Sequence, residues 1–153
     1  MKKQLSKSEI KELNEQLKQK YNLEFFEKKD NVVLFEDGFK SVLKNNVPVF
    51  FWHENNWLPT LKSLLHNNFL KKITIDMGAV KFVASGADVM RPGIVEIDST
   101  IIKDEVIAVI DSTHKKPLAV GLALFSGKEM QEMKQGKVIK NLHYVGDEVW
   151  KIE

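Results

Sequence analysis

The stretch KFVASGADVMRPGIVEID, residues 81–98, decides the fold of the second half of the chain. Its first part is a short apolar run that ends at Gly86, and glycine is the residue that most often stops a helix in left-handed backbone. A second turn, Arg91-Pro92-Gly93, leads into the strand-like run IVEID. The same corner contains the only arginine among 23 basic residues. The sequence therefore predicts a helix, a glycine loop, a tight turn and a strand in immediate succession.

Composition places the chain among folded proteins of one domain or two small ones. It has 153 residues, of which 43% are hydrophobic and 29% charged. No apolar run approaches the ~20 residues that span a bilayer, and the N-terminus is too polar for a signal peptide. The absence of cysteine excludes disulfides, thiolate metal ligands and a thiol nucleophile. We expect a cytoplasmic protein with no membrane partner.

The first half of the chain has the pattern of a small α/β unit. Ser6 and Glu9 have the spacing of a capping box, and apolar residues follow at intervals of three and four up to about Lys20. The runs Val32–Phe35 and Val47–Trp52 predict strands. Pro59 suits the first turn of a second helix, whose apolar residues are Leu61, Leu64 and Leu65.

The second half has the pattern of a small, mostly antiparallel barrel. Its predicted strands are Ile73–Asp76, Ile94–Asp98, Glu105–Asp111 and Leu118–Phe125, followed by a helix with the capping box Ser126/Glu129 that closes at Gly136. The runs VIKNLHYV and EVWKI predict a final hairpin around Gly146-Asp147. The two units are expected to pack together, with their boundary near Asn67-Asn68.

Motifs for catalysis or metal binding are not found. The four histidines lie far apart, and no phosphate-binding glycine loop or nucleophile motif occurs. Glu96 and Asp98 share one face of a predicted strand, which suits acid–base chemistry, but an exposed polar strand face explains the same pattern. We expect no catalysis, no metal and no cofactor.

The corner at residues 81–93 has the residue types of a binding site for an anion. Arg91 offers a planar fork suited to phosphate or a base edge, and Lys81 adds a second positive charge. Gly86 and Gly93 allow a partner's backbone to approach closely. The alternative is structural: a helix stop, a tight turn and a solvated arginine.

The segment KFVASGADVMRPGI resembles the opening of PUA domains, and VGLALFSGKEMQEMKQGKVIKNLHYVGDEVW resembles their closing segment. PTLKSLLHNN, at residues 59–68, resembles the region before the PUA domain in the malignant T-cell-amplified sequence family and its archaeal relatives. The resemblance implies an α+β chain. A small N-terminal α/β pre-PUA domain (residues 1–72) is followed by a C-terminal PUA pseudobarrel of mostly antiparallel strands (residues 73–153).

The resemblance further implies an RNA-binding, non-catalytic factor of translation. Its partner would be tRNA or rRNA, with the small ribosomal subunit as a place of action and a second protein as a possible companion. PUA domains bind RNA in the groove between the first helix with its loop and the last strand. Carried over, this groove comprises Lys81, Ser85, Gly86, Ala87, Arg91, Pro92, Gly93, Lys140, His143, Tyr144 and Lys151.

Charge and aromatic residues keep two alternatives open. Residues 74–153 contain 10 basic and 12 acidic residues, whereas a free RNA-binding domain usually has a basic footprint. Phe50, Phe51, Trp52 and Trp57 are either core or an exposed patch that would indicate a protein-interaction adaptor. An accessory subunit of an RNA-modification enzyme is the other alternative.

Overall fold

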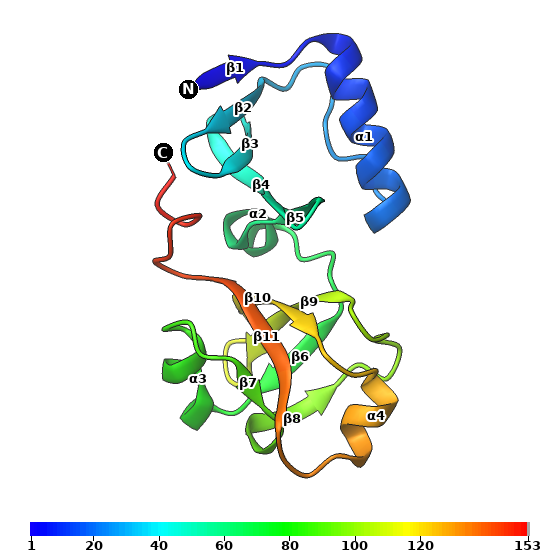
Figure 1. Ribbon diagram of the computed structural model, residues 1–153, viewed down its shortest axis with the longest axis vertical. Coiled ribbons are helices and arrows are strands. Elements are labelled where there is room, and N and C mark those ends of the chain that lie inside the picture. Colours follow the sequence, from blue (N-terminus) through cyan, green and yellow to red (C-terminus); the bar gives the residue numbers. More distant parts are fainter. Residues whose placement is uncertain (153) are drawn as a thin grey trace.

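The computed structural model describes residues 1–152 and places two β-sheets at opposite ends of an elongated molecule (Figure 1). Sheet A is an antiparallel meander in which each strand pairs with the next along the chain. Its strands are β1 (Lys2–Gln4), β2 (Val32–Glu36), β3 (Lys40–Lys44), β4 (Val47–His53) and β5 (Asn56–Pro59). The strands β1, β3 and β5 were not expected from the sequence.

Helix α1 (Lys7–Tyr21) has the predicted capping box. The Ser6 hydroxyl accepts a hydrogen bond from the Glu9 amide at 3.2 Å, and the Glu9 carboxylate accepts one from the Ser6 amide at 3.0 Å. The bond from the Ser6 amide, helped by Lys3, lowers the pKa of Glu9 to about 2. Leu13 and Leu17 pack into the core of sheet A, so the expected helix and its apolar face are confirmed.

Sheet B is nearly closed and barrel-like, with strand order β7-β11-β10-β9-β6-β8. All its pairings are antiparallel except that of β6 with β9. The strands are β6 (Lys72–Ile75), β7 (Val89–Met90), β8 (Ile94–Ile97), β9 (Val106–Asp111), β10 (Pro117–Ala123) and β11 (Lys137–Tyr144). Helices α3 (Met77–Val83) and α4 (Gly127–Glu132) flank it (Figure 1). The predicted α+β fold with a mostly antiparallel pseudobarrel is confirmed.

Helix α2 (Leu61–His66) joins the two sheets. Leu61 and Leu64 are buried against Ala108 of β9 and Val120 of β10 in one apolar cluster. The N-cap of α2 is Thr60, whose hydroxyl accepts a hydrogen bond from the Ser63 amide. The assignment of Pro59 to the first turn was wrong, because this residue ends β5.

The end of the chain differs from the predicted hairpin. β11 ends at Tyr144, and residues 145–151 form consecutive turns with no strand. The Asp147 carboxylate accepts hydrogen bonds from the amides of Tyr144 and Trp150, both at 2.9 Å, and so folds the chain locally. The helix closure expected at Gly136 was also displaced, because α4 ends at Glu132 and Gly136 lies in the turn before β11.

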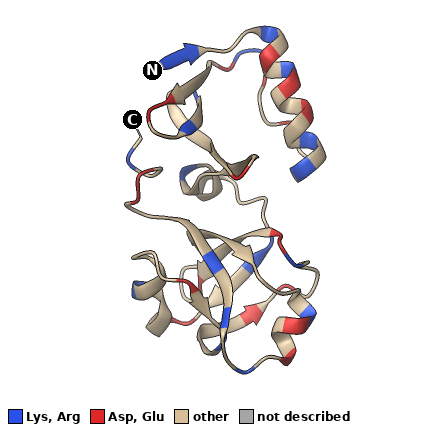
Figure 2. Ribbon diagram, in the orientation of Figure 1, with Lys and Arg blue, Asp and Glu red and all other residues tan. Residues whose placement is uncertain are grey.

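The aromatic residues of β4 and β5 are mainly core. Phe50 and Phe51 are buried, with exposed fractions of 0% and 4%, whereas Trp52 and Trp57 are half-buried. Of these four residues, only the two indoles keep exposed surface. Figure 2 shows lysines and acidic residues interspersed along α1. Within residues 1–152, no helix is both long and apolar enough to cross a membrane.

Candidate nucleic-acid interface

Helix α3 presents one exposed face to solvent. Asp76 caps its N-terminus, because the Asp76 carboxylate accepts a hydrogen bond from the Ala79 amide at 2.9 Å. The opposite face buries Val83 in the barrel core. We call the exposed side chains Met77, Lys81 and Phe82 of this helix, together with Ser85 two residues after its end, the α3 surface.

Phe82 is the aromatic residue of the α3 surface, and the sequence did not single it out. Its side chain is 59% exposed, and the Lys81 Nζ atom lies 5.4 Å from its ring centroid. An exposed aromatic ring beside a cation is a platform for stacking a nucleobase. The available signal was periodicity: Ala79, Val80 and Val83 occupy the inward positions of the helix, which leaves Phe82 outside.

The loop after α3 has the predicted left-handed glycine. Gly86 has a φ of +105°, and its amide donates to the Val83 carbonyl at 3.0 Å. A Cβ atom at this position would lie 2.8 Å from Cε1 of Tyr144. The space beside Gly86 is therefore filled by the Tyr144 ring, and the expected open notch for a nucleic-acid backbone is absent at this point.

Asn141 of β11 fastens this loop to the barrel. Its side-chain amide donates to the carbonyls of Val83 and Ala87, both at 3.0 Å. The Asn141 backbone amide donates to the Asp88 carboxylate at 2.7 Å. A residue before the loop and two within it are thus held by a single asparagine. A lone asparagine in a strand gave no sequence signal for this role.

Arg91 is directed at α4. It begins the 3-10 turn η1 (Arg91–Gly93), and its Nε donates to the Met130 carbonyl at 2.6 Å. A second, longer bond of 3.4 Å joins its Nη1 to the Ile94 carbonyl. Gly93 packs on α3, because a Cβ atom there would lie 3.1 Å from Cβ of Ala79. The guanidinium therefore holds the turn to the end of α4 and is only half-exposed.

His143 is fully buried and does not lie on the predicted binding surface. Its Nε2 accepts a hydrogen bond from the Leu61 amide at 3.0 Å, so its proton is on Nδ1, which faces the Asp147 carboxylate at 2.7 Å. His143 thus links sheet B to the start of α2. The prediction that it contacts RNA was wrong, because the interface between the two units covers it.

The other predicted residues remain accessible. Lys81, Ser85, Ala87, Pro92, Lys140 and Lys151 are exposed. Lys151 lies in the segment after β11, which turns back toward α2 and sheet A (Figure 1). It is therefore separated along the molecule from the α3 surface, which Ala87 extends toward β11.

The carboxylate pair considered for acid–base chemistry is a solvated surface feature. Glu96 is exposed and lies 3.4 Å from Lys115. Hydrogen bonds from the Thr100 hydroxyl and amide lower the pKa of Asp98 and so keep it ionised. No group of three or more candidate metal ligands occurs within residues 1–152.

Two known family models match different parts of the chain. The PUA domain model matches residues 71–145, and the model of a domain of unknown function, DUF1947, matches residues 2–67. An uncharacterized protein of Methanocaldococcus jannaschii is 44% identical over 95% of this chain and 93% of its own length. Translation machinery-associated protein 20 of Schizosaccharomyces pombe is 34% identical over 74% of this chain and 65% of its own length. Malignant T-cell-amplified sequence 1 of Rattus norvegicus is 30% identical over 80% of this chain and 71% of its own length.

Solved structures have a similar fold. A hypothetical protein of Pyrococcus horikoshii has a TM-score of 0.84 and 33% identity, and the match covers 99% of both chains. A chain of the archaeal box H/ACA sRNP Nop10–Cbf5 complex has a TM-score of 0.50 and 30% identity over 63% of this chain and 30% of its own length. With a DUF1947 domain followed by a PUA domain, the chain belongs to the family of the malignant T-cell-amplified sequence and translation machinery-associated 20 proteins.

Proposed function

We propose that this protein binds RNA without catalysing a reaction, and that it does so through the α3 surface of its PUA domain. The observation that carries the proposal is the pairing of an exposed aromatic ring, Phe82, with the adjacent cation Lys81. Unpaired bases stack on aromatic rings, and lysines neutralise the neighbouring phosphates. The loop that continues this surface is braced by Asn141 and Tyr144, which reduces the entropy lost on binding.

The RNA proposed is tRNA or rRNA of the translation machinery. Support comes from the name of the fission-yeast relative, which associates that protein with translation. The PUA half has few cations, so binding to a small surface of a larger particle fits better than tight binding to free RNA. Lys140, on the neighbouring strand β11, is the further cation proposed to take part.

The test is a titration with tRNA and with small ribosomal subunits, using variants of exposed residues. Lys81→Gln should weaken binding and reduce the slope of log K against log salt by about 1, because one phosphate contact is lost. Phe82→Ala should reduce the free energy of RNA binding by about 1–3 kcal/mol and leave the salt dependence of binding unchanged, because base stacking involves no charge. Arg91 is less informative, because its removal also releases the Met130 carbonyl.

Lys103→Gln is the matched control, because Lys103 is exposed, its side chain makes no hydrogen bond or ion pair within residues 1–152, and it lies outside the α3 surface. It should leave affinity nearly unchanged. If Lys81→Gln and Phe82→Ala bind like the control, the α3 surface is not the RNA site.

A second candidate function is that of an accessory subunit in RNA modification. The observation in its favour is the similarity to a chain of the box H/ACA complex. The adaptor alternative loses its support, because Phe50 and Phe51 are buried. Pull-down with the ribosome or with a modification enzyme distinguishes the two remaining functions.

A further inference from the structure

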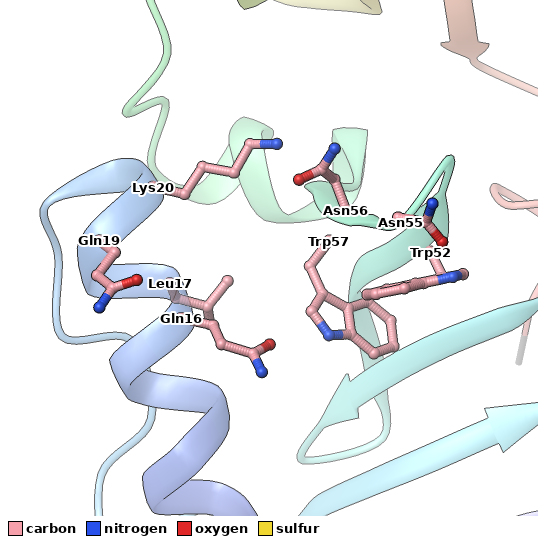
Figure 3. A pocket seen from close by; sticks show the side chains of 8 residues that line it. All are labelled: Gln16, Leu17, Gln19, Lys20, Trp52, Asn55, Asn56 and Trp57. Atoms are coloured by element: carbon pink, nitrogen blue, oxygen red, sulfur yellow. The ribbon is translucent and has the colours of Figure 1, made fainter.

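A hollow of about 380 Å³ lies between the C-terminal end of α1 and the β4–β5 hairpin (Figure 3). This is within the range of roughly 300–1,000 Å³ typical of small-molecule sites. Leu17 of α1 is buried at its edge, and the indoles of Trp52 and Trp57 form its aromatic side. We call this hollow the tryptophan pocket.

The aromatic side of the tryptophan pocket is held in place before any ligand binds. Trp52 and Trp57 face each other across the hairpin, with ring centroids 5.0 Å apart and planes at 68°. The Tyr21 hydroxyl donates a 2.6 Å hydrogen bond to the Trp57 carbonyl and so ties β5 to α1. The hairpin turn has left-handed backbone at Glu54 and Asn55, the conformation of a tight two-residue turn. Two indoles are therefore fixed at the edge of a concave surface.

The remaining wall of the pocket consists of amide side chains. Gln16, Gln19 and Asn55 line it, and none of the three side chains hydrogen-bonds to any residue within 1–152. Each amide carries both donors and an acceptor, which is the complement required by the edge of a nucleobase. Amides beside aromatic rings thus provide stacking and edge recognition in one place.

The charge of the pocket favours an anionic ligand. Lys20 extends from α1 across the pocket toward Asn56 (Figure 3) and has no carboxylate partner among residues 1–152. Partial burial lowers the pKa of its ammonium group, and a bound anion would restore the favourable environment of the charge. Lys40 of β3 lies 4.7 Å from the Trp52 ring centroid but does not line the pocket, so Lys20 is the cation of the lining. The nearby Glu54 does not line the pocket.

We infer that the tryptophan pocket binds an unpaired nucleotide, with the base against the indoles, its edge on the amides and its phosphate at Lys20. A cationic ligand such as a methylated lysine is disfavoured by Lys20, which lines the pocket. A polyproline segment also binds to aromatic grooves, but its prolines carry no anionic group that would pair with Lys20. In Figure 1, α1 and β5 lie away from α3, so this site is separate from the α3 surface and does not depend on the function proposed for it.

Adenosine 5′-monophosphate and adenosine are suitable probes in two-dimensional NMR of the indole N–H signals, assigned through Trp52→Phe and Trp57→Phe. The monophosphate should shift the signals of Trp52 and Trp57 and leave that of Trp150 in place. Lys20→Gln should lower the affinity for the monophosphate by about tenfold, which is the effect of losing one charge-assisted hydrogen bond. The affinity for adenosine should not change, because adenosine lacks the phosphate.

Lys11→Gln, an exposed lysine earlier on α1 that does not line the pocket, is the matched control and should bind both probes normally. The same shifts should persist in Lys81→Gln, which separates this site from the α3 surface. The inference is overturned if about 5 mM monophosphate, a concentration that would saturate even weak sites, shifts neither indole. It is also overturned if Lys20→Gln has no effect, or if a polyproline peptide binds and the nucleotide does not.

Discussion

Single glycines decide how closely the elements of the PUA domain approach. Gly127 begins α4, and its amide donates to the Ile101 carbonyl at 2.8 Å. A Cβ atom at this position would collide with the Asp98 carbonyl oxygen and would lie 3.0 Å from Cα of Ser99. Both neighbours are backbone atoms, which cannot turn aside as a side chain can. The helix N-terminus therefore packs on the loop after β8 only because residue 127 has no side chain.

Gly127→Ala should lower the free energy of unfolding by about 3 kcal/mol, since the added methyl group forces the backbone apart. Denaturant unfolding followed by circular dichroism measures the change. Gly78→Ala in α3 is the control: its Cβ would meet only Asp76 Oδ1 at 3.3 Å, and helix propensity favours alanine, so a change below about 1 kcal/mol is expected. Equal effects of the two substitutions would show that the contact with the loop after β8 is not tight.

At the scale of elements, β11 organises both the candidate RNA surface and the contact between the two units. Its first half pairs with β7, its Asn141 holds the α3 loop and its Tyr144 ring fills the space beside Gly86. Its His143 reaches α2. The sequence indicated β11 as a strand, but the partners of alternate side chains follow from its position between β7 and β10.

Asn141→Ala should loosen the loop that continues the α3 surface. The carbonyls of Val83 and Ala87 lose their donor, which should cost about 1–3 kcal/mol of stability. Hydrogen exchange of the amides at residues 84–88 should accelerate more than exchange in sheet A. The neighbouring Lys140→Ala, at an exposed position, should change stability by less than about 0.5 kcal/mol. Unchanged exchange in Asn141→Ala would mean that the loop is held by other contacts.

At the scale of the whole molecule, the two units are joined by an apolar cluster and one polar link. Leu61 and Leu64 of α2 pack on β9 and β10, and the Leu61 amide donates to His143. Asp147 completes the link: burial alone would raise its pKa, but hydrogen bonds from His143, Trp150 and Tyr144 outweigh burial and hold the pKa below its usual value. The carboxylate is therefore more strongly ionised in the folded protein than in the unfolded chain.

The link should give the protein a specific acid sensitivity. A carboxyl group with a lowered folded-state pKa stabilises the fold above the unfolded pKa of about 4, and this contribution disappears as pH falls through the folded pKa. Asp147→Asn should therefore lower the free energy of unfolding by about 1 kcal/mol at pH 7. The difference in this free energy between the variant and the unsubstituted protein should shrink below about pH 4. Unfolding curves across pH measure it, with the exposed Glu148→Gln as control. A constant difference at all pH values would exclude an electrostatic role for Asp147.

Local patterns in the sequence predicted the capping boxes of α1 and α4, the left-handed Gly86, seven of the strands and the general fold. They did so because capping, backbone conformation and alternation of apolar residues depend on near neighbours. Tertiary structure alone decided that Tyr144 covers Gly86, that Arg91 turns to Met130 and that His143 lies between the two units. Each of these contacts joins residues 39 or more positions apart, and the packing of sheet B, not local preference, brings them together.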